Sequence, residues 1–217
     1  FYTKQLKNKI MNILQIHNKY LFEGGEDQVV EEEKQMLLKN GHNVYQILRY
    51  NKKEIVTIKD RISTLLNLSY SKKTKEIINN ELKKIPKIDV AHVHNIFPLW
   101  SYSIFEVLNE NKIPIVMTLH NYRLMWPKFN LLDKNLIKYG CFKNSIFKTF
   151  FISRLMNRKK VLLNIVKKFI TLSNFAKEKF IQTDISSKKI TIKQNFLKKK
   201  YFNIKKIQDK NFAMYAS

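Results

Sequence analysis

The chain has 217 residues, is 44% hydrophobic and carries a formal net charge of +24. Its one cysteine, Cys141, excludes a disulfide within the chain and a zinc site built from several thiolates, and this favours a reducing, cytoplasmic location. No segment approaches the roughly 18 uninterrupted apolar residues of a membrane span, and the first residues lack the pattern of a signal peptide. We therefore expect a cytoplasmic protein.

Short apolar runs alternate with helical patterns along the chain. The first ten residues show no hydrophobic period, and we expect an extension over 1–10. The runs predict strands at 13–16, 44–48, 89–93, 114–119, 169–172 and 190–193. The helical patterns cover 26–39, two helices within 53–84 broken near 69–71, and then 102–111, 146–166 and 174–182. A long irregular loop is expected at 122–142, and a last apolar run at 212–216 has the pattern of a strand that is beginning. This order predicts an α/β fold with a Rossmann-like parallel sheet flanked by helices.

Three of the predicted strands run into the same dipeptide. These dipeptides are His17-Asn18, His94-Asn95 and His120-Asn121. In open parallel sheets, ligands bind beyond the carboxyl ends of the strands. The sequence therefore places three imidazoles and three carboxamides where a ligand would lie, and an enzyme is the leading interpretation.

Two adjacent glycines stand between the first strand and the first helix. Gly24 and Gly25 let backbone amides approach a ligand closely, and the start of the following helix presents free N–H groups. The segment lacks a G-x-G-x-x-G pattern, so a tight turn is the simpler interpretation. In that case Glu26 and Asp27 are favourable in the first helical turn.

A zinc site is an alternative for the strand-end histidines. His17, His94 and His120 would leave one open position on the metal, as in catalytic zinc sites, and the protein would then be a zinc hydrolase. A lone histidine at a strand end is more often a hydrogen-bonding residue, so we expect no metal ligands. His92 and His42 are expected to be structural.

Positive charge is concentrated in the second half of the chain. Residues 143–210 hold 19 basic and 3 acidic side chains, which suggests a surface that faces anionic lipid or an anionic substrate. Only five of the 41 basic residues are arginine, whereas proteins that read DNA sequence favour arginine. We therefore expect no nucleic-acid partner, and the lysines equally fit an AT-rich genome.

The basic segment 146–166 is amphipathic. Phe150, Phe151 and Leu155 alternate with Arg154, Arg158, Lys159 and Lys160. This pattern is typical of a helix that lies on a membrane surface. A helix with its apolar face in the core and solvated lysines fits equally well, and both interpretations stay open.

Four segments together resemble the N-terminal half of the family-four retaining glycosyltransferases of the GT-B fold. They are MNILQIHN at 11–18 with GGED at 24–27, HVHNIF at 92–97, TLHNYRL at 118–124, and LSNFAK at 172–177 followed by NF at 195–196. Order and spacing hold from about residue 11 to 217.

The resemblance implies an acceptor-side Rossmann-like domain at 11–205, followed by a linker and the first strand of a donor domain at 206–217. The second, donor-binding domain would then lie outside this chain, which we expect to be inactive alone. The resemblance gives His120 contact with the transferred sugar as the catalytic residue. The other expected substrate-binding residues are His17, Gly24, Gly25, Glu26, His94, Asn95, Asn121, Arg123, Ser173 and Asn195.

The expected reaction is transfer of a hexose from a nucleotide sugar to a hydroxyl of a glycan or lipid-linked acceptor, with retention, in cell-surface polysaccharide biosynthesis. The nucleotide sugar is a co-substrate, and no further cofactor is expected. The enzyme would work in the cytoplasm, at the inner face of the membrane. The alternative of a different class is a non-catalytic module that binds an acceptor or a membrane, and a zinc hydrolase or a nucleic-acid binder ranks lower.

Overall fold

The computed structural model describes residues 9–20, 24–51, 57, 59, 63, 67, 69–122, 161–182 and 185–195. Within them lies one parallel sheet. Its strands are β1 (Asn12–Lys19), β2 (Asn43–Tyr50), β3 (Val90–Val93), β4 (Ile115–Leu119), β5 (Lys168–Thr171) and β6 (Ile190–Ile192). The helices are α1 (Gly25–Lys39), α4 (Lys72–Leu82), α5 (Ser103–Glu110) and α7 (Asn174–Ile181), with a short 3₁₀ turn η1 (Ser187–Lys189). The predicted α/β class with a Rossmann-like sheet is confirmed.

The strand order fixes where a ligand can enter. The sheet runs β2-β1-β3-β4-β5-β6, and every neighbouring pair is parallel. The chain moves from β1 to β2 on one side and then returns to β3 on the other, so the order reverses between β1 and β3. In doubly wound sheets, this reversal opens a crevice at the carboxyl ends of the two strands.

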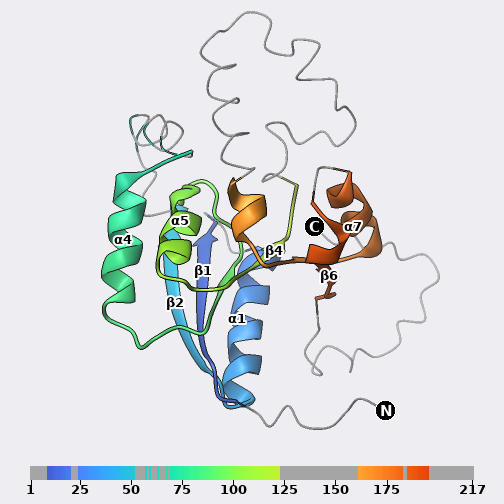
Figure 1. Ribbon diagram of the computed structural model, residues 1–217, viewed down its shortest axis with the longest axis horizontal. Coiled ribbons are helices and arrows are strands. Elements are labelled where there is room, and N and C mark those ends of the chain that lie inside the picture. The colour runs from blue at the N-terminus through green and yellow to red at the C-terminus, as the bar shows by residue number, and fades with distance from the viewer. Residues whose placement is uncertain are drawn as a thin grey trace, which may run out of the picture.

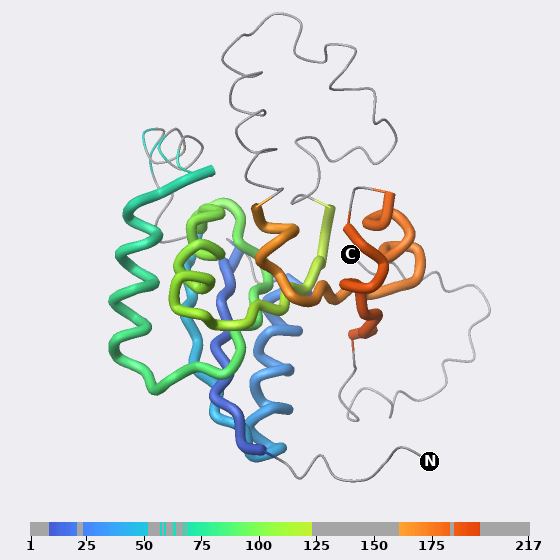
Figure 2. The backbone as a smooth tube through the Cα atoms, in the orientation of Figure 1, coloured from blue at the N-terminus to red at the C-terminus, as the bar shows by residue number. Residues whose placement is uncertain are grey.

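Helices cover both faces of the sheet. In Figure 1, β1 and β2 lie between α1 on one side and α4 and α5 on the other, and the tube in Figure 2 shows β1 passing through the middle of the domain. Helices α4 and α5 are joined where Lys75 meets both Glu106 at 3.1 Å and Glu110 at 3.0 Å. The start of α4 is fixed because Ser71 caps it with its side chain and donates its own N–H to Ser103.

The two faces of the sheet differ in polarity. The face toward α4 and α5 is apolar and contributes Leu14, Ile16, Val93 and Met117 to the hydrophobic core. The face toward α1 carries Gln15 and His17 of β1, and the register aligns Gln15 with His92 of β3. Burial on both faces is usual for a parallel sheet, but here one buried face is polar at its carboxyl end.

Helix α1 begins and ends where the sequence predicts. Gly24 is its N-cap, and the Gly24 N–H donates to Asp27 Oδ2 at 2.9 Å. Gly41, just past the helix end, has φ of +81°, a conformation that glycine adopts without the penalty of a Cβ. The helix therefore lies with fixed ends over the polar face of the sheet.

The predicted strands and helices are confirmed wherever the structure describes them. Strand β1 continues to Lys19, so His17 and Asn18 lie inside the strand, because β2 pairs with it over its whole length. Residues 161–165 are helical. Most of the extension at 1–10, all of the loop at 122–142 except Tyr122, the basic segment up to residue 160 and the whole of 206–217 lie outside the described residues. No helix in the described part of the chain is long and apolar enough to span a membrane.

Candidate functional site

The strand-end histidines meet at the carboxyl edge of the sheet. The ring centroids of His17 and His94 are 6.1 Å apart, and those of His94 and His120 are 5.4 Å apart with the rings stacked. His94 Nδ1 lies 3.1 Å from His120 Nε2, within hydrogen-bonding distance. The reversal between β1 and β3 thus brings together three imidazoles from three strands.

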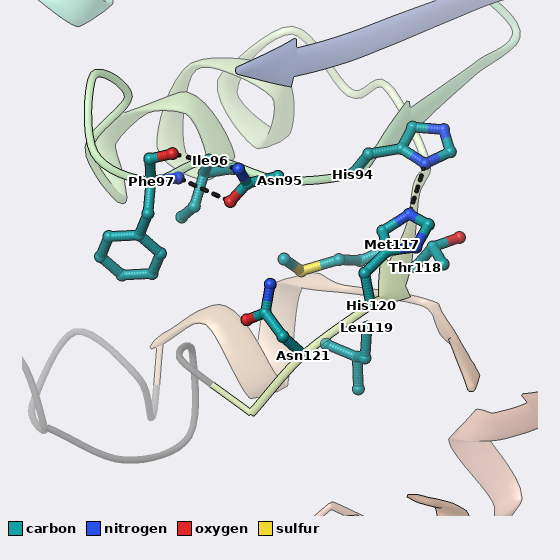
Figure 3. Close-up of a pocket in the computed structure, with 9 residues that line it drawn as sticks. All are labelled: His94, Asn95, Ile96, Phe97, Met117, Thr118, Leu119, His120 and Asn121. Carbon is teal, nitrogen blue, oxygen red and sulfur yellow. Dashed lines mark hydrogen bonds between the residues drawn. The ribbon is translucent and has the colours of Figure 1, made fainter. Parts of the chain in front are cut away.

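A shallow pocket of about 260 Å³, which includes space open to solvent, lies beside His94 and His120. Its walls are residues 94–97 after β3 and residues 117–121 at the end of β4. Figure 3 shows the two histidines joined at one end of this pocket and Asn121 reaching toward its middle. His17 is fully buried beneath the edge and does not line this pocket.

The first two asparagines of the repeated dipeptide hold the edge together. The Asn18 N–H donates to the Asn95 carbonyl at 2.8 Å, and the Asn95 side chain donates to the Asn18 carbonyl at 3.2 Å. Asn95 Oδ1 also accepts the N–H of Phe97 at 3.0 Å. These amides therefore join the ends of β1 and β3, and Asn95 shapes one wall of the pocket.

The glycine turn is connected to the histidines through two carboxylates. Asp27 receives the Gly24 N–H with Oδ2 and contacts His17 Nε2 at 2.8 Å with Oδ1. Glu26 accepts from Tyr20 Oη and from Asn121 Nδ2, each at 2.8 Å. Because Asn121 follows His120 directly, the start of α1 and the end of β4 are held against each other.

Gly25 is exposed, and a Cβ added to it would meet nothing within 4 Å. A Cβ on Gly24 would come no closer than 3.8 Å to Tyr20. Neither glycine has a positive φ. The described residues thus give no steric reason for two glycines here, and the free space is on the solvent side of the helix start.

Burial favours the neutral form of the imidazoles that meet at this edge. Burial lowers the pKa of His17, although the hydrogen bond to Asp27 opposes that effect. Burial also lowers the pKa of His94 well below the ordinary histidine value and lowers that of His120, where the charge of Glu26 opposes it. A neutral imidazole can donate with one nitrogen and accept with the other.

Two residues that sequence reasoning did not place in the site join the cluster. His92 lies beside His94 with ring centroids 4.0 Å apart and the rings tilted by 38°. Glu33 of α1 lies 3.4 Å from His92 Nδ1 and 3.3 Å from His94 Nε2. Burial lowers the pKa of His92 to about 3. The sequence feature that could have placed His92 in the site is its two-residue spacing from His94. This spacing puts both side chains on one face of the strand.

Two expected site residues lie away from the pocket. Ser173 caps α7, its side chain accepting the Ala176 N–H at 3.1 Å, and Asn195 is exposed after β6. Neither lines the pocket. Arg123 lies outside the described residues.

The histidine set considered for zinc is not the one that the fold assembles. Among the described residues, one group of three or more metal-ligating side chains has all its ligand atoms within 4.8 Å of one another, and it consists of Glu33, His92 and His94. His17 is paired with Asp27, and His120 with His94. The zinc interpretation built on His17, His94 and His120 has no support in this geometry.

Comparison with solved structures gives similar chains at low identity. The crystal structure of Anabaena Alr3699/HepE in complex with UDP and glucose is 11% identical, with a TM-score of 0.45 over 86% of this chain and 45% of that one. UDP-GlcNAc 2-epimerase from Neisseria meningitidis bound to UDP-GlcNAc is 11% identical, with a TM-score of 0.46 over 85% of this chain and 46% of that one. This chain thus spans less than half the length of these proteins. No curated protein matches it.

The family comparison covers most of the chain. Residues 24–198 match the family described as Glycosyltransferase Family 4. This range contains the glycine turn, the pocket, the histidines that end β3 and β4, and the caps of α1 and α7. The chain therefore belongs to Glycosyltransferase Family 4, as the four sequence segments indicate, and its described residues form a Rossmann-like N-terminal domain of that family.

Proposed function

We propose that this domain is the acceptor side of an enzyme that transfers a hexose from a nucleotide sugar to a hydroxyl of a glycan or lipid-linked acceptor, with retention. The observation that carries the proposal is the position of His120. It borders the pocket at the carboxyl edge of the sheet and is tied through Asn121 and Glu26 to the glycine turn. The family resemblance implies His120 at the transferred sugar and Gly24 and Gly25 beside the donor phosphates, and this connection is consistent with it.

His120 is the proposed catalytic residue. Its Nε2 is engaged by His94, which leaves Nδ1 for a hydroxyl of the transferred sugar. Burial lowers the pKa of His120, and a ring in the neutral form can hydrogen bond without placing a full positive charge beside an oxocarbenium-like transition state. Its contribution would be positioning and electrostatic stabilisation, the effects that fixed polar groups supply best.

Gly24 and Gly25 are proposed to admit the donor phosphates. The free space at Gly25 and its position at the N-terminus of α1, the positive end of the helix dipole, favour an anion there. Two carboxylates lie in the same turn, Asp27 bound by His17 and Gly24 and Glu26 bound by Tyr20 and Asn121. Their charges oppose an anion, so we place the phosphates on the solvent side of Gly25. Asn95 and Asn121 would hold the substrate from the pocket wall. The nucleotide sugar is a co-substrate in this proposal.

We further propose that the acceptor is lipid-linked and that the enzyme works in the cytoplasm at the inner face of the membrane. Phe175 is 58% exposed on α7, and Ile181 is 39% exposed near the end of the same helix. The Lys179 Nζ lies over the Phe175 ring, 5.4 Å from its centroid, and Lys167, Lys168 and Lys188 are exposed nearby along the chain. Apolar groups among lysines suit an anionic lipid surface.

The test is sugar transfer by the product of the whole open reading frame. A panel of radiolabelled nucleotide sugars is offered with lipid-linked acceptors, and the anomeric configuration of the product is read by NMR. The proposal expects transfer with retained configuration and no turnover by residues 1–217 alone, because a site of this kind needs both domains. An inverted product, or transfer by the 217-residue chain alone, would contradict it.

A further inference from the structure

Glu33 is buried beneath the pocket without a hydrogen bond for one of its oxygens. Glu33 of α1 is 3% exposed, and its Oε2 has no hydrogen-bond partner. His94 Nε2, 3.3 Å away, also has none. Two buried polar atoms that face each other without bonding are uncommon in folded proteins, where such atoms are nearly always satisfied.

The spacing of these atoms matches that of ligands on one metal ion. Glu33 Oε2 lies 3.3 Å from His94 Nε2 and 3.4 Å from His92 Nδ1, and all three ligand atoms are within 4.8 Å of one another. Nitrogen and oxygen ligands at about 2.0–2.2 Å from a tetrahedral zinc ion are about 3.3–3.5 Å apart. The two distances from the carboxylate oxygen to the ring nitrogens thus match the edges of such a site, and the two nitrogens lie within 4.8 Å of each other.

The outer contacts of the three side chains are also those of metal ligands. His92 contacts Thr118 Oγ1 with Nε2 at 2.8 Å, and His94 contacts His120 with Nδ1 at 3.1 Å. Glu33 accepts from Lys193 with its other oxygen, Oε1. Ligating histidines typically bond a second group with the far ring nitrogen, and ligating carboxylates are themselves hydrogen bonded.

We propose that Glu33, His92 and His94 bind a divalent first-row cation, zinc by their donor set, under the floor of the pocket. Two imidazoles and one carboxylate suit zinc better than magnesium or calcium, which prefer oxygen ligands. The ion fixes the His94 ring and, through it, the orientation of His120. This assignment does not depend on the proposed sugar transfer, because the cation would bind to Glu33, His92 and His94 whether or not a sugar occupies the pocket.

The competing account is that Lys193 alone neutralises Glu33. In that case the ammonium satisfies the carboxylate, and no cation enters. The two accounts differ in whether the untagged 217-residue chain, once freed of metal by a chelator, binds an added cation. We therefore titrate it with Co²⁺, whose visible absorption reports tetrahedral coordination, and then displace Co²⁺ with Zn²⁺. Circular dichroism spectra of every variant establish that it is folded.

The expected result is one Co²⁺ per chain in the wild type and in the His42→Gln control, which removes a histidine outside the cluster. Glu33→Gln and His92→Gln should lose the absorption, and Thr118→Val should weaken binding by about 10–100-fold, as is usual for an outer-contact residue. Absence of stoichiometric Co²⁺ in the wild type would overturn the proposal even if a variant failed to fold. Equal binding by the wild type and a folded Glu33→Gln chain would also overturn it.

Discussion

His94 Nδ1 lies 3.1 Å from His120 Nε2, although the two histidines end different strands and stand 26 positions apart in the chain. One of these nitrogens must carry the proton, so the tautomer of one ring sets that of the other. His120 borders the pocket, whereas His94 reaches from the pocket wall to the buried Glu33 and His92. The edge that lines the pocket is thus joined to the buried Glu33 and His92 through the contact between His120 and His94.

Asp27 should be a stabilising residue as well as a neighbour of the site. Asp27→Asn removes the charge that His17 and the Gly24 N–H share, and the group is 5% exposed. We expect the free energy of unfolding to fall by about 1–3 kcal/mol, the range for a disrupted buried hydrogen bond. Urea unfolding measures it. Glu31→Gln, at an exposed position on the same helix, is the control and should change stability by less than about 0.5 kcal/mol.

Stability should fall in mild acid. The pKa values of His17, His94 and His120 are lowered in the fold, and that of His92 falls to about 3. Below about pH 6.5 the unfolded chain therefore binds protons more readily than the folded chain does, and the free energy of unfolding falls as the pH falls. Urea unfolding at pH 7.5 and 5.5, with a chelator present, measures the change. A folded His17→Gln chain should show a smaller slope, and a wild-type curve that is flat or rises toward acid would contradict the account.

Gly25→Ala should separate stability from ligand binding. The position has an ordinary φ and open space for a methyl group, so the folded chain should be unchanged or gain about 0.4–1 kcal/mol. If the donor phosphates approach this backbone, the full-length enzyme should lose about tenfold or more in kcat/KM for the nucleotide sugar. Thermal melting and steady-state kinetics measure the two effects. Gly41→Ala is the opposite control, because its positive φ predicts lost stability with kinetics unchanged.

Binding to lipid should depend on Phe175. The chain should sediment with vesicles that contain anionic lipid, and less so as salt screens its lysines. Phe175→Ser removes the exposed ring and should reduce that binding, while neutral vesicles bind little in either case. Met36→Ser, on α1, is the control, since Met36 is exposed away from the lysines of α7. Equal, negligible binding to both kinds of vesicle would remove the membrane from the proposal.

The sequence predicted the fold well because apolar periodicity dominates it. Strands such as Val90–Val93 are short, apolar and followed by polar residues, and that pattern determines a parallel sheet. The repeated His-Asn pairs pointed to the edge where His94 and His120 do border a pocket. Burial of His17 could not be predicted, since it depends on β2 pairing with the last residues of β1.

Glu33 was missed for a different reason. An acidic residue in a helix is usually a solvated one, and only the polar face of the sheet, with Gln15 aligned beside His92, gives it a buried environment. The polar face can be recognised only when the pairing register of β1 and β3 is known. Sequence spacing within one helix could not reveal it.

The measurement that tests the central claim most directly is the turnover of the whole open reading frame product with His120→Ala beside His42→Ala. Removing the ring that borders the pocket should lower kcat by about 100-fold or more, as for loss of one fixed group at a transition state, while the melting temperature stays near that of the wild type. His42→Ala, a matched histidine away from the pocket, should keep its activity. Unchanged turnover in a folded His120→Ala enzyme would contradict the account.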